Sequence, residues 1–78
     1  MKRADKPIRY WQHALRRQTQ RGVSASQIEL TVRRPDRVRP ARRPDARRYE
    51  KAFTRRKRLA VIAIEDDETI WIVSAWWM

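Results

Sequence analysis

The sequence predicts an α+β domain in which two N-terminal helices pack on a small antiparallel β-sheet. Two segments, 12–21 and 24–34, have helical spacing of apolar residues and recognisable end signals. Three later runs have the alternating or apolar pattern of strands: 48–53, 59–64 and 69–77. We therefore expect a three-stranded meander, and residues 8–11 are compatible with a short additional strand.

The two predicted helices have defined ends. Gly22, the only glycine in the chain, follows the first helix at a position where a left-handed cap is cheapest for glycine. Ser24 and Gln27 form a capping box at the start of the second helix, and an overlapping box begins at Ser26. Pro35 ends this helix, because the residue before a proline is pushed out of the helical region.

The length of 78 residues predicts a single domain, and two of its segments are basic and poor in apolar residues. Residues 1–7 read as a flexible basic arm, and residues 8–78 form the domain. Within it, residues 35–46 hold three prolines among arginines and very few apolar side chains. This composition predicts a mobile basic loop.

The last predicted strand is rich in tryptophan. In a regular strand Trp71 and Trp77 lie on one face and Trp76 on the other, so at least one indole points away from the helices. An exposed indole stacks on nucleobases or is buried by a protein partner, and core or interface packing is the more common use. The acidic residues 65–68 are interpreted as a solvated turn rather than a metal site.

The charge is distributed unevenly and indicates a polyanionic partner. All 20 basic residues, 16 of them Arg, lie at or before Arg58, whereas the final 20 residues carry four acidic residues and no basic ones. Nucleic acid is favoured over a membrane surface, because no apolar amphipathic helix accompanies the charge. Arginine suits this partner, since its planar fork binds phosphate and guanine in a bidentate manner.

Composition also excludes several classes of site. The chain has no Cys and one His, which excludes a disulfide framework and a thiol nucleophile and argues against a structural zinc site. We expect no metal and no small-molecule cofactor. No apolar run approaches the roughly 18 residues of a spanning helix, so the expected location is the cytoplasm.

The candidate catalytic residues are His13, Arg17 and Arg21, which a helix places in one stripe because they recur every four residues. Cleavage of RNA by its own 2′-hydroxyl needs a group that moves protons near neutral pH and a cation for the charged phosphorane. His13 suits the first role, and Arg17 and Arg21 suit the second. The alternatives for His13 are a non-catalytic RNA contact and a structural role at the helix start.

A second group of side chains on or near the predicted hairpin would hold the RNA. All but one of these side chains are positively charged. The exception is a tyrosine, which is either a base-stacking residue or a half-buried strand residue. The predicted nucleic-acid-binding residues are Arg16, Arg47, Arg48, Tyr49, Lys51, Arg55, Arg56, Lys57 and Arg58.

Short motifs along the chain together resemble a known family pattern. They are His13-Ala14, Arg17, Arg21-Gly22-Val23-Ser24, Pro35-Asp36, Tyr49, the run 59–64 and Val73-Ser74-Ala75-Trp76. The pattern resembles a small bacterial and phage domain family of unknown function that is similar to BrnT toxins and, more distantly, to the RelE/ParE toxin superfamily. The chain departs from the pattern at Gln18, where the family usually has an apolar residue.

The resemblance implies a microbial ribonuclease fold and a toxin that acts on RNA, including ribosome-bound mRNA, as a metal-independent endoribonuclease. It also implies an antitoxin that covers the basic surface. Two other functions remain open at this stage. One is a non-enzymatic nucleic-acid-binding or phage accessory protein, and the other is a protein-interaction module that uses the Trp-rich last strand.

Overall fold

Five strands and two helices make up the domain, in a computed structural model that describes residues 2–78. After a short 3₁₀ turn the elements follow in the order β1 (Ile8–Tyr10), α1 (Gln12–Gln20), α2 (Ala25–Arg33), β2 (Arg37–Pro40), β3 (Ala46–Ala52), β4 (Arg58–Glu65) and β5 (Ile70–Trp77). The α+β class is as expected, and both helices begin and end within a residue or two of their predicted bounds.

The predicted three-stranded antiparallel sheet is wrong, because the sheet is five-stranded and mixed. Its order is β1-β5-β4-β3-β2, with β1 parallel to β5 and every other pair antiparallel. β3, β4 and β5 are the predicted meander. β2 lies in the segment predicted as a loop, where four exposed residues take their order from hydrogen bonds to β3 rather than from burial.

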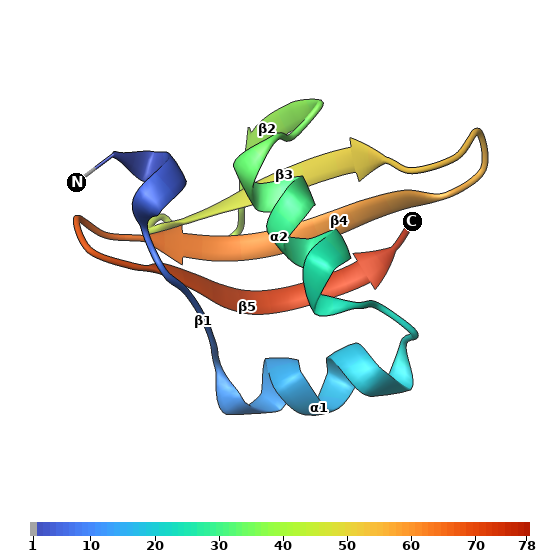
Figure 1. Ribbon diagram of the computed structural model, residues 1–78, viewed down its shortest axis with the longest axis horizontal. Coiled ribbons are helices and arrows are strands. Elements are labelled where there is room, and N and C mark those ends of the chain that lie inside the picture. The colour runs from blue at the N-terminus through green and yellow to red at the C-terminus, as the bar shows by residue number, and fades with distance from the viewer. Residues whose placement is uncertain (1) are drawn as a thin grey trace.

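The helices cover different parts of the sheet (Figure 1). α2 crosses in front of β3 and β4, whereas α1 lies below β5 and packs along that strand. The Ser24–Gln27 capping box starts α2 as predicted, and Gly22 turns the chain with a φ of 66°. The second box is absent, since Ser26 lies inside the helix.

The core lies between α2 and the face of the sheet that it covers. Ile28 and Val32 from α2 meet Val61 of β4 and Ile72 of β5, and each of these four side chains is at most 1% exposed. Burial of large aliphatic side chains is the main favourable term in the stability of so small a domain. Because α2 covers this face of the sheet, the opposite face is the one without a helix.

The basic N-terminal segment is tied to the domain in the part described. Arg3–Asp5 form the 3₁₀ turn, and Arg3 Nε and Lys6 Nζ lie 3.0 and 2.9 Å from the carboxylate of Glu65. The Arg33 guanidinium donates to three carbonyls of this segment. A segment predicted to be a flexible arm is therefore anchored by charge, while Met1 lies outside the described residues.

We expect Glu65→Gln to release this anchor in a pH-dependent way. Partial burial opposes ionisation of Glu65, but hydrogen bonds and charge from Lys6 and Arg3 outweigh it and lower its pKa below the ordinary 4.5. The stabilisation is therefore complete above pH 4.5 and is lost as pH falls through the lowered pKa. Urea unfolding should show a loss of up to about 1 kcal/mol at pH 7 that shrinks in acid. A difference that grows as pH falls would contradict this assignment.

Candidate nucleic-acid interface

The helix-free face of the sheet carries two of the three tryptophans of β5. A register shift leaves Val73 without a partner, because Ile62 pairs with Ser74 and Ala63 with Ile72. Such a bulge reverses the alternation of the strand. Trp71 and Trp76 therefore share the helix-free face, whereas Trp77 packs against the core. Regular alternation predicted Trp71 and Trp77 on one face and Trp76 on the other. This prediction is wrong, because it did not include the bulge at Val73.

Two arginines lie over indole rings on this side of the molecule, at cation–π distance. The guanidinium carbon of Arg43 is 5.2 Å from the ring centroid of Trp11, and that of Arg48 is 5.1 Å from the ring of Trp76. We call the surface the Trp–Arg face and define it by six residues: Trp11, Arg42, Arg43, Arg48, Trp71 and Trp76.

Each stacked arginine is oriented by a carboxylate. Arg43 Nε and Nη2 donate to the two oxygens of Asp45 at 3.0 and 2.9 Å, and these hydrogen bonds lower the pKa of the Asp45 carboxyl. Arg48 Nε lies 2.8 Å from Oε2 of Glu50, which is 2% exposed. The latter pair is close but is not aligned as a hydrogen bond, so charge and packing hold it. Each of the two guanidinium groups thus lies between an indole ring and a carboxylate.

His13 lies in a shallow hollow of about 540 Å³ at the margin of this face. The other lining residues are Tyr10, Trp11, Gln12, Arg16 and Trp71. The imidazole is exposed and meets Trp11 edge-on, with ring centroids 5.8 Å apart. A proton-transfer group, an exposed guanidinium and two indole rings therefore share one solvent-accessible site, which we call the His13 hollow.

The predicted stripe of His13, Arg17 and Arg21 occupies one helix but not one site. Arg21 Nη1 donates to the backbone carbonyl of Ala75 at 2.9 Å, where β5 continues beyond its pairing with β1. Arg17 is exposed and does not line the His13 hollow. The structure brings His13 together with Arg16, which the sequence placed among the RNA-holding residues.

The predicted RNA-holding residues on β3 divide between the two faces. Arg48 lies on the Trp–Arg face. Tyr49 is 5% exposed and belongs to the core, and Lys51 donates to the Arg34 carbonyl at 2.9 Å. Arg47 is paired with Ala63 on the helix-covered side. Alternation along the strand thus places three of these four side chains on the helix-covered side and leaves Arg48 on the Trp–Arg face.

The basic turn between β3 and β4 is solvent-exposed and lies at one end of the sheet. Arg55 and Arg56 are both exposed. Lys57 Nζ lies 5.4 Å from the ring centroid of Trp77, and Arg58 begins β4. The turn therefore approaches the core-side Trp77 and does not line the His13 hollow.

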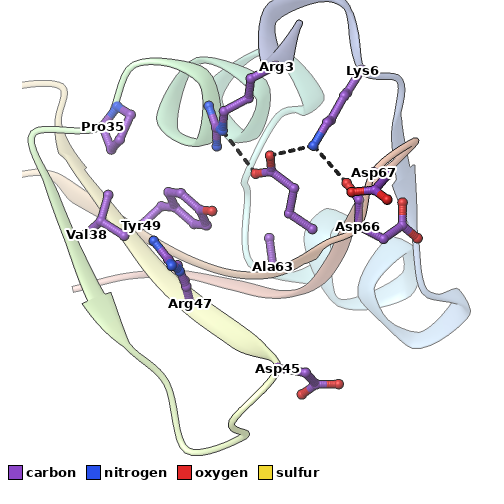
Figure 2. A pocket seen from close by; sticks show the side chains of 11 residues that line it. Arg3, Lys6, Pro35, Val38, Asp45, Arg47, Tyr49, Ala63, Asp66 and Asp67 are labelled. Atoms are coloured by element: carbon purple, nitrogen blue, oxygen red, sulfur yellow. Dashed lines mark hydrogen bonds and ion pairs between the residues drawn. The ribbon is translucent and has the colours of Figure 1, made fainter. Parts of the chain in front are cut away.

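A separate cavity of about 500 Å³ lies on the helix-covered side (Figure 2). Arg3 and Lys6 meet Glu65 across its upper side, and Arg47 lies near Tyr49 at its floor. Asp66 and Asp67 stand at its rim. Because both charges are present and largely paired, this cavity serves to dock the N-terminal segment and does not offer a uniform basic surface to a polyanion.

The described residues contain no cluster of three or more His, Cys, Asp and Glu side chains with the proximity to hold a metal ion. In the same part of the chain, no helix is long and apolar enough to cross a membrane.

Sequence reasoning missed Trp11, Arg42, Arg43 and Glu50 as site residues. Arg43 and Asp45 flank a proline two residues apart, a spacing that permits a local ion pair and was a readable signal. Glu50 lies two residues from Arg48 on β3, so it faces the same side of the strand. The position of Arg42 and the contact of Arg43 with Trp11 depend on the β2–β3 hairpin, which includes a strand that the sequence did not predict.

The matched family covers nearly the whole fold described above. A profile for the family "Domain of unknown function (DUF4258)" matches residues 10–77. The chain belongs to the DUF4258 family. Comparisons with curated proteins and with solved structures gave no match. The expected membership of a small family of unknown function is confirmed, without a link to BrnT or RelE/ParE. Every residue of the Trp–Arg face and of the His13 hollow lies within the matched part of this DUF4258 domain.

Proposed function

We propose that the domain binds single-stranded RNA on the Trp–Arg face and cleaves it at the His13 hollow, as a cytoplasmic protein of the toxin type. The observation that carries the proposal is the juxtaposition of His13 and Arg16 with Trp11 and Trp71 in one hollow. Charge alone attracts RNA but moves no proton, and this hollow adds a group that does.

The surface supports single strands rather than duplexes. Unpaired bases stack on exposed indoles and on guanidinium planes, and each stacked base contributes about 1–3 kcal/mol. The Arg43–Trp11 and Arg48–Trp76 pairs offer guanidinium planes supported by indoles, and the half-buried Trp71 offers an indole at the His13 hollow. Arg16 and Arg42 have no ion pair with any described residue, so they are free to neutralise phosphates.

The chemistry follows from the composition of the hollow. Neutral His13 accepts the proton of a ribose 2′-hydroxyl, and the 2′ oxygen forms a bond to the adjacent phosphorus. Arg16 stabilises the additional negative charge of the phosphorane. The bond from phosphorus to the 5′ oxygen then breaks, and that oxygen takes a proton from the open solvent. The products are a 2′,3′-cyclic phosphate and a 5′-hydroxyl end.

The resemblance to BrnT and RelE/ParE toxins supports the biological setting of this proposal. In that setting the substrate includes ribosome-bound mRNA, and an antitoxin covers the Trp–Arg face. An acidic partner suits this face, because the chain carries a net charge of +11.

A salt titration of binding tests which face contacts RNA. We expect Arg42→Ala to reduce the slope of log affinity against log salt by close to one unit, because each neutralised phosphate contributes about 0.7–0.9. Arg47→Ala removes the same charge from the helix-covered side and should leave the slope unchanged. Fluorescence anisotropy with a labelled, 2′-O-methyl single-stranded RNA measures both. Equal effects of the two variants would contradict the proposed interface.

A non-enzymatic RNA-binding protein is the second candidate function. The edge-on contact of His13 with Trp11 favours it, because this contact gives the imidazole a role in ordering the indole. Incubation of the purified protein with end-labelled RNA separates the two candidates. Tight, salt-sensitive binding without cleavage would support the second and reject the first.

A further inference from the structure

The β2–β3 hairpin forms a second hollow on the Trp–Arg face. It measures about 420 Å³ and is lined by Pro40, Ala41, Arg42, Arg43, Arg48, Ile62 and Trp76. This volume lies within the usual range of about 300–1,000 Å³ for small-molecule sites. The hairpin supplies one wall and the sheet the other, with mostly apolar surfaces between the guanidinium groups. Such a lining suits a flat ring better than a phosphate. We call this site the hairpin hollow.

Arg48 enters this hollow already fixed in position. Trp76 supports the plane of its guanidinium, and Glu50 holds its Nε side at 2.8 Å. Arg39 Nε approaches the same carboxylate oxygen at 3.9 Å. Nη1 and Nη2 of Arg48 have no partner among residues 2–78, and its side chain remains 30% exposed. Two parallel N–H donors are therefore available to a ligand.

The charge balance distinguishes this arginine from those that suit phosphates. The carboxylate of Glu50 is 2% exposed and offsets much of the positive charge of Arg48, so the long-range attraction for an anion is reduced. Arg42, in the same hollow, has no such partner in the described structure. The arrangement gives Arg48 two directional donors beside an offsetting carboxylate, which suits the acceptor edge of a neutral ring.

The geometry of those donors selects among the bases. Guanine presents O6 and N7 as adjacent acceptors that match an arginine fork, whereas adenine places a donor, N6, beside N7. Uracil has the N3–H donor between its two carbonyl acceptors, whereas unpaired cytosine presents O2 and N3 as adjacent acceptors on a smaller ring. Among the purines, only guanine satisfies both terminal nitrogens of Arg48 while its two-ring system occupies the hollow.

We propose that the hairpin hollow is a guanine-binding pocket, in which Arg48 reads the O6/N7 edge of an unstacked guanine and Glu50 positions Arg48. The proposal rests on the proposed RNA binding and adds to it a base preference. Arg48 is thus a specificity-determining residue, and Glu50 is a positioning residue that does not touch the RNA.

The test uses short 2′-O-methyl oligouridylates with a single central purine, so that cleavage does not interfere. We expect the oligonucleotide with guanine to bind about ten-fold or more tightly than the one with adenine, in line with a good bidentate contact. Inosine retains O6 and N7 and should bind like guanine. 7-Deazaguanine lacks N7 and should bind like adenine. Equal affinity for all four would overturn the pocket.

Arg48→Lys separates base reading from charge. Lysine preserves the positive charge but has no fork, so we expect the guanine preference to fall to less than two-fold while the salt slope stays unchanged. Glu50→Gln should also reduce the preference, because Arg48 loses its orienting partner. If the preference survives in Arg48→Lys, or if the salt slope falls with it, Arg48 contacts phosphate and the inference is wrong.

The inference and the proposed function fail in different ways. Absence of any salt-sensitive RNA binding would reject RNA as the ligand and both conclusions with it. Binding with the expected salt slope but without a guanine preference would reject only the pocket. Urea unfolding of each variant identifies a loss of fold, and substitution of the half-buried Arg48 keeps the test independent of the buried Glu50.

Discussion

His13→Ala is expected to lower the single-turnover rate of RNA cleavage by about 10²–10⁴-fold, the usual contribution of a positioned acid or base. The side chain is exposed at the start of α1, so its removal should leave the fold intact. RNA affinity should change by less than about three-fold, because the arginines that contact phosphate remain. Cleavage of end-labelled RNA at enzyme excess, with anisotropy beside it, measures both quantities.

Gln20→Ala is the matched control for this prediction. Gln20 is an exposed residue at the opposite end of α1 and lines no hollow. Its replacement should leave both cleavage and binding at the wild-type level. Full cleavage by the His13→Ala protein would remove His13 from the chemistry, and a parallel loss of binding would assign it to RNA contact alone.

Ile72→Ala is expected to cost about 2–5 kcal/mol of unfolding free energy, since it leaves a cavity in a close-packed core. Ile72 is 0% exposed and pairs with Tyr10 of β1 on one side and Ala63 of β4 on the other. A loss of this size approaches the whole stability of many small domains. Urea denaturation followed by circular dichroism measures it.

Val38→Ala provides the comparison on the surface. Val38 lies on the outermost strand and is 44% exposed, so its truncation should change stability by about 0.5 kcal/mol or less. A cost below 1 kcal/mol for Ile72→Ala would show that the junction of β1, β5 and β4 is not part of the cooperative core.

Local signals predicted the helices and the central strands because these elements have their own sequence determinants. The Ser24–Gln27 box and Gly22 define helix ends through contacts within a few residues. β4 and β5 contain long apolar runs that have no stable alternative to burial. β2 has neither kind of signal, since it is composed of Arg37–Pro40 and all four residues are exposed. Its order comes from pairing with β3, and composition does not report such pairing.

The candidate site was predictable only in part, for a similar reason. His13 was identified from its chemistry and Arg16 from its charge, and they lie in one hollow, whereas helical spacing pointed to Arg17 and Arg21. The remaining members come from distant segments. The unpaired Val73 places Trp71 and Trp76 on one face, and the hairpin brings Arg43 to Trp11. A bulge and a hairpin position are tertiary outcomes with weak local signals.

The parallel pairing of β1 with β5 makes the site a late product of chain synthesis. Ile8 pairs with Ile70, and the His13 hollow needs Trp71 as one of its walls. Contacts between residues so far apart in sequence form late in folding, because closing the long loop between them costs conformational entropy. A nascent chain that already carries His13 and Arg16 therefore lacks the completed hollow until its last strand has been synthesised. For the cleavage proposed at this hollow, the order of synthesis delays activity until Trp71 is in place.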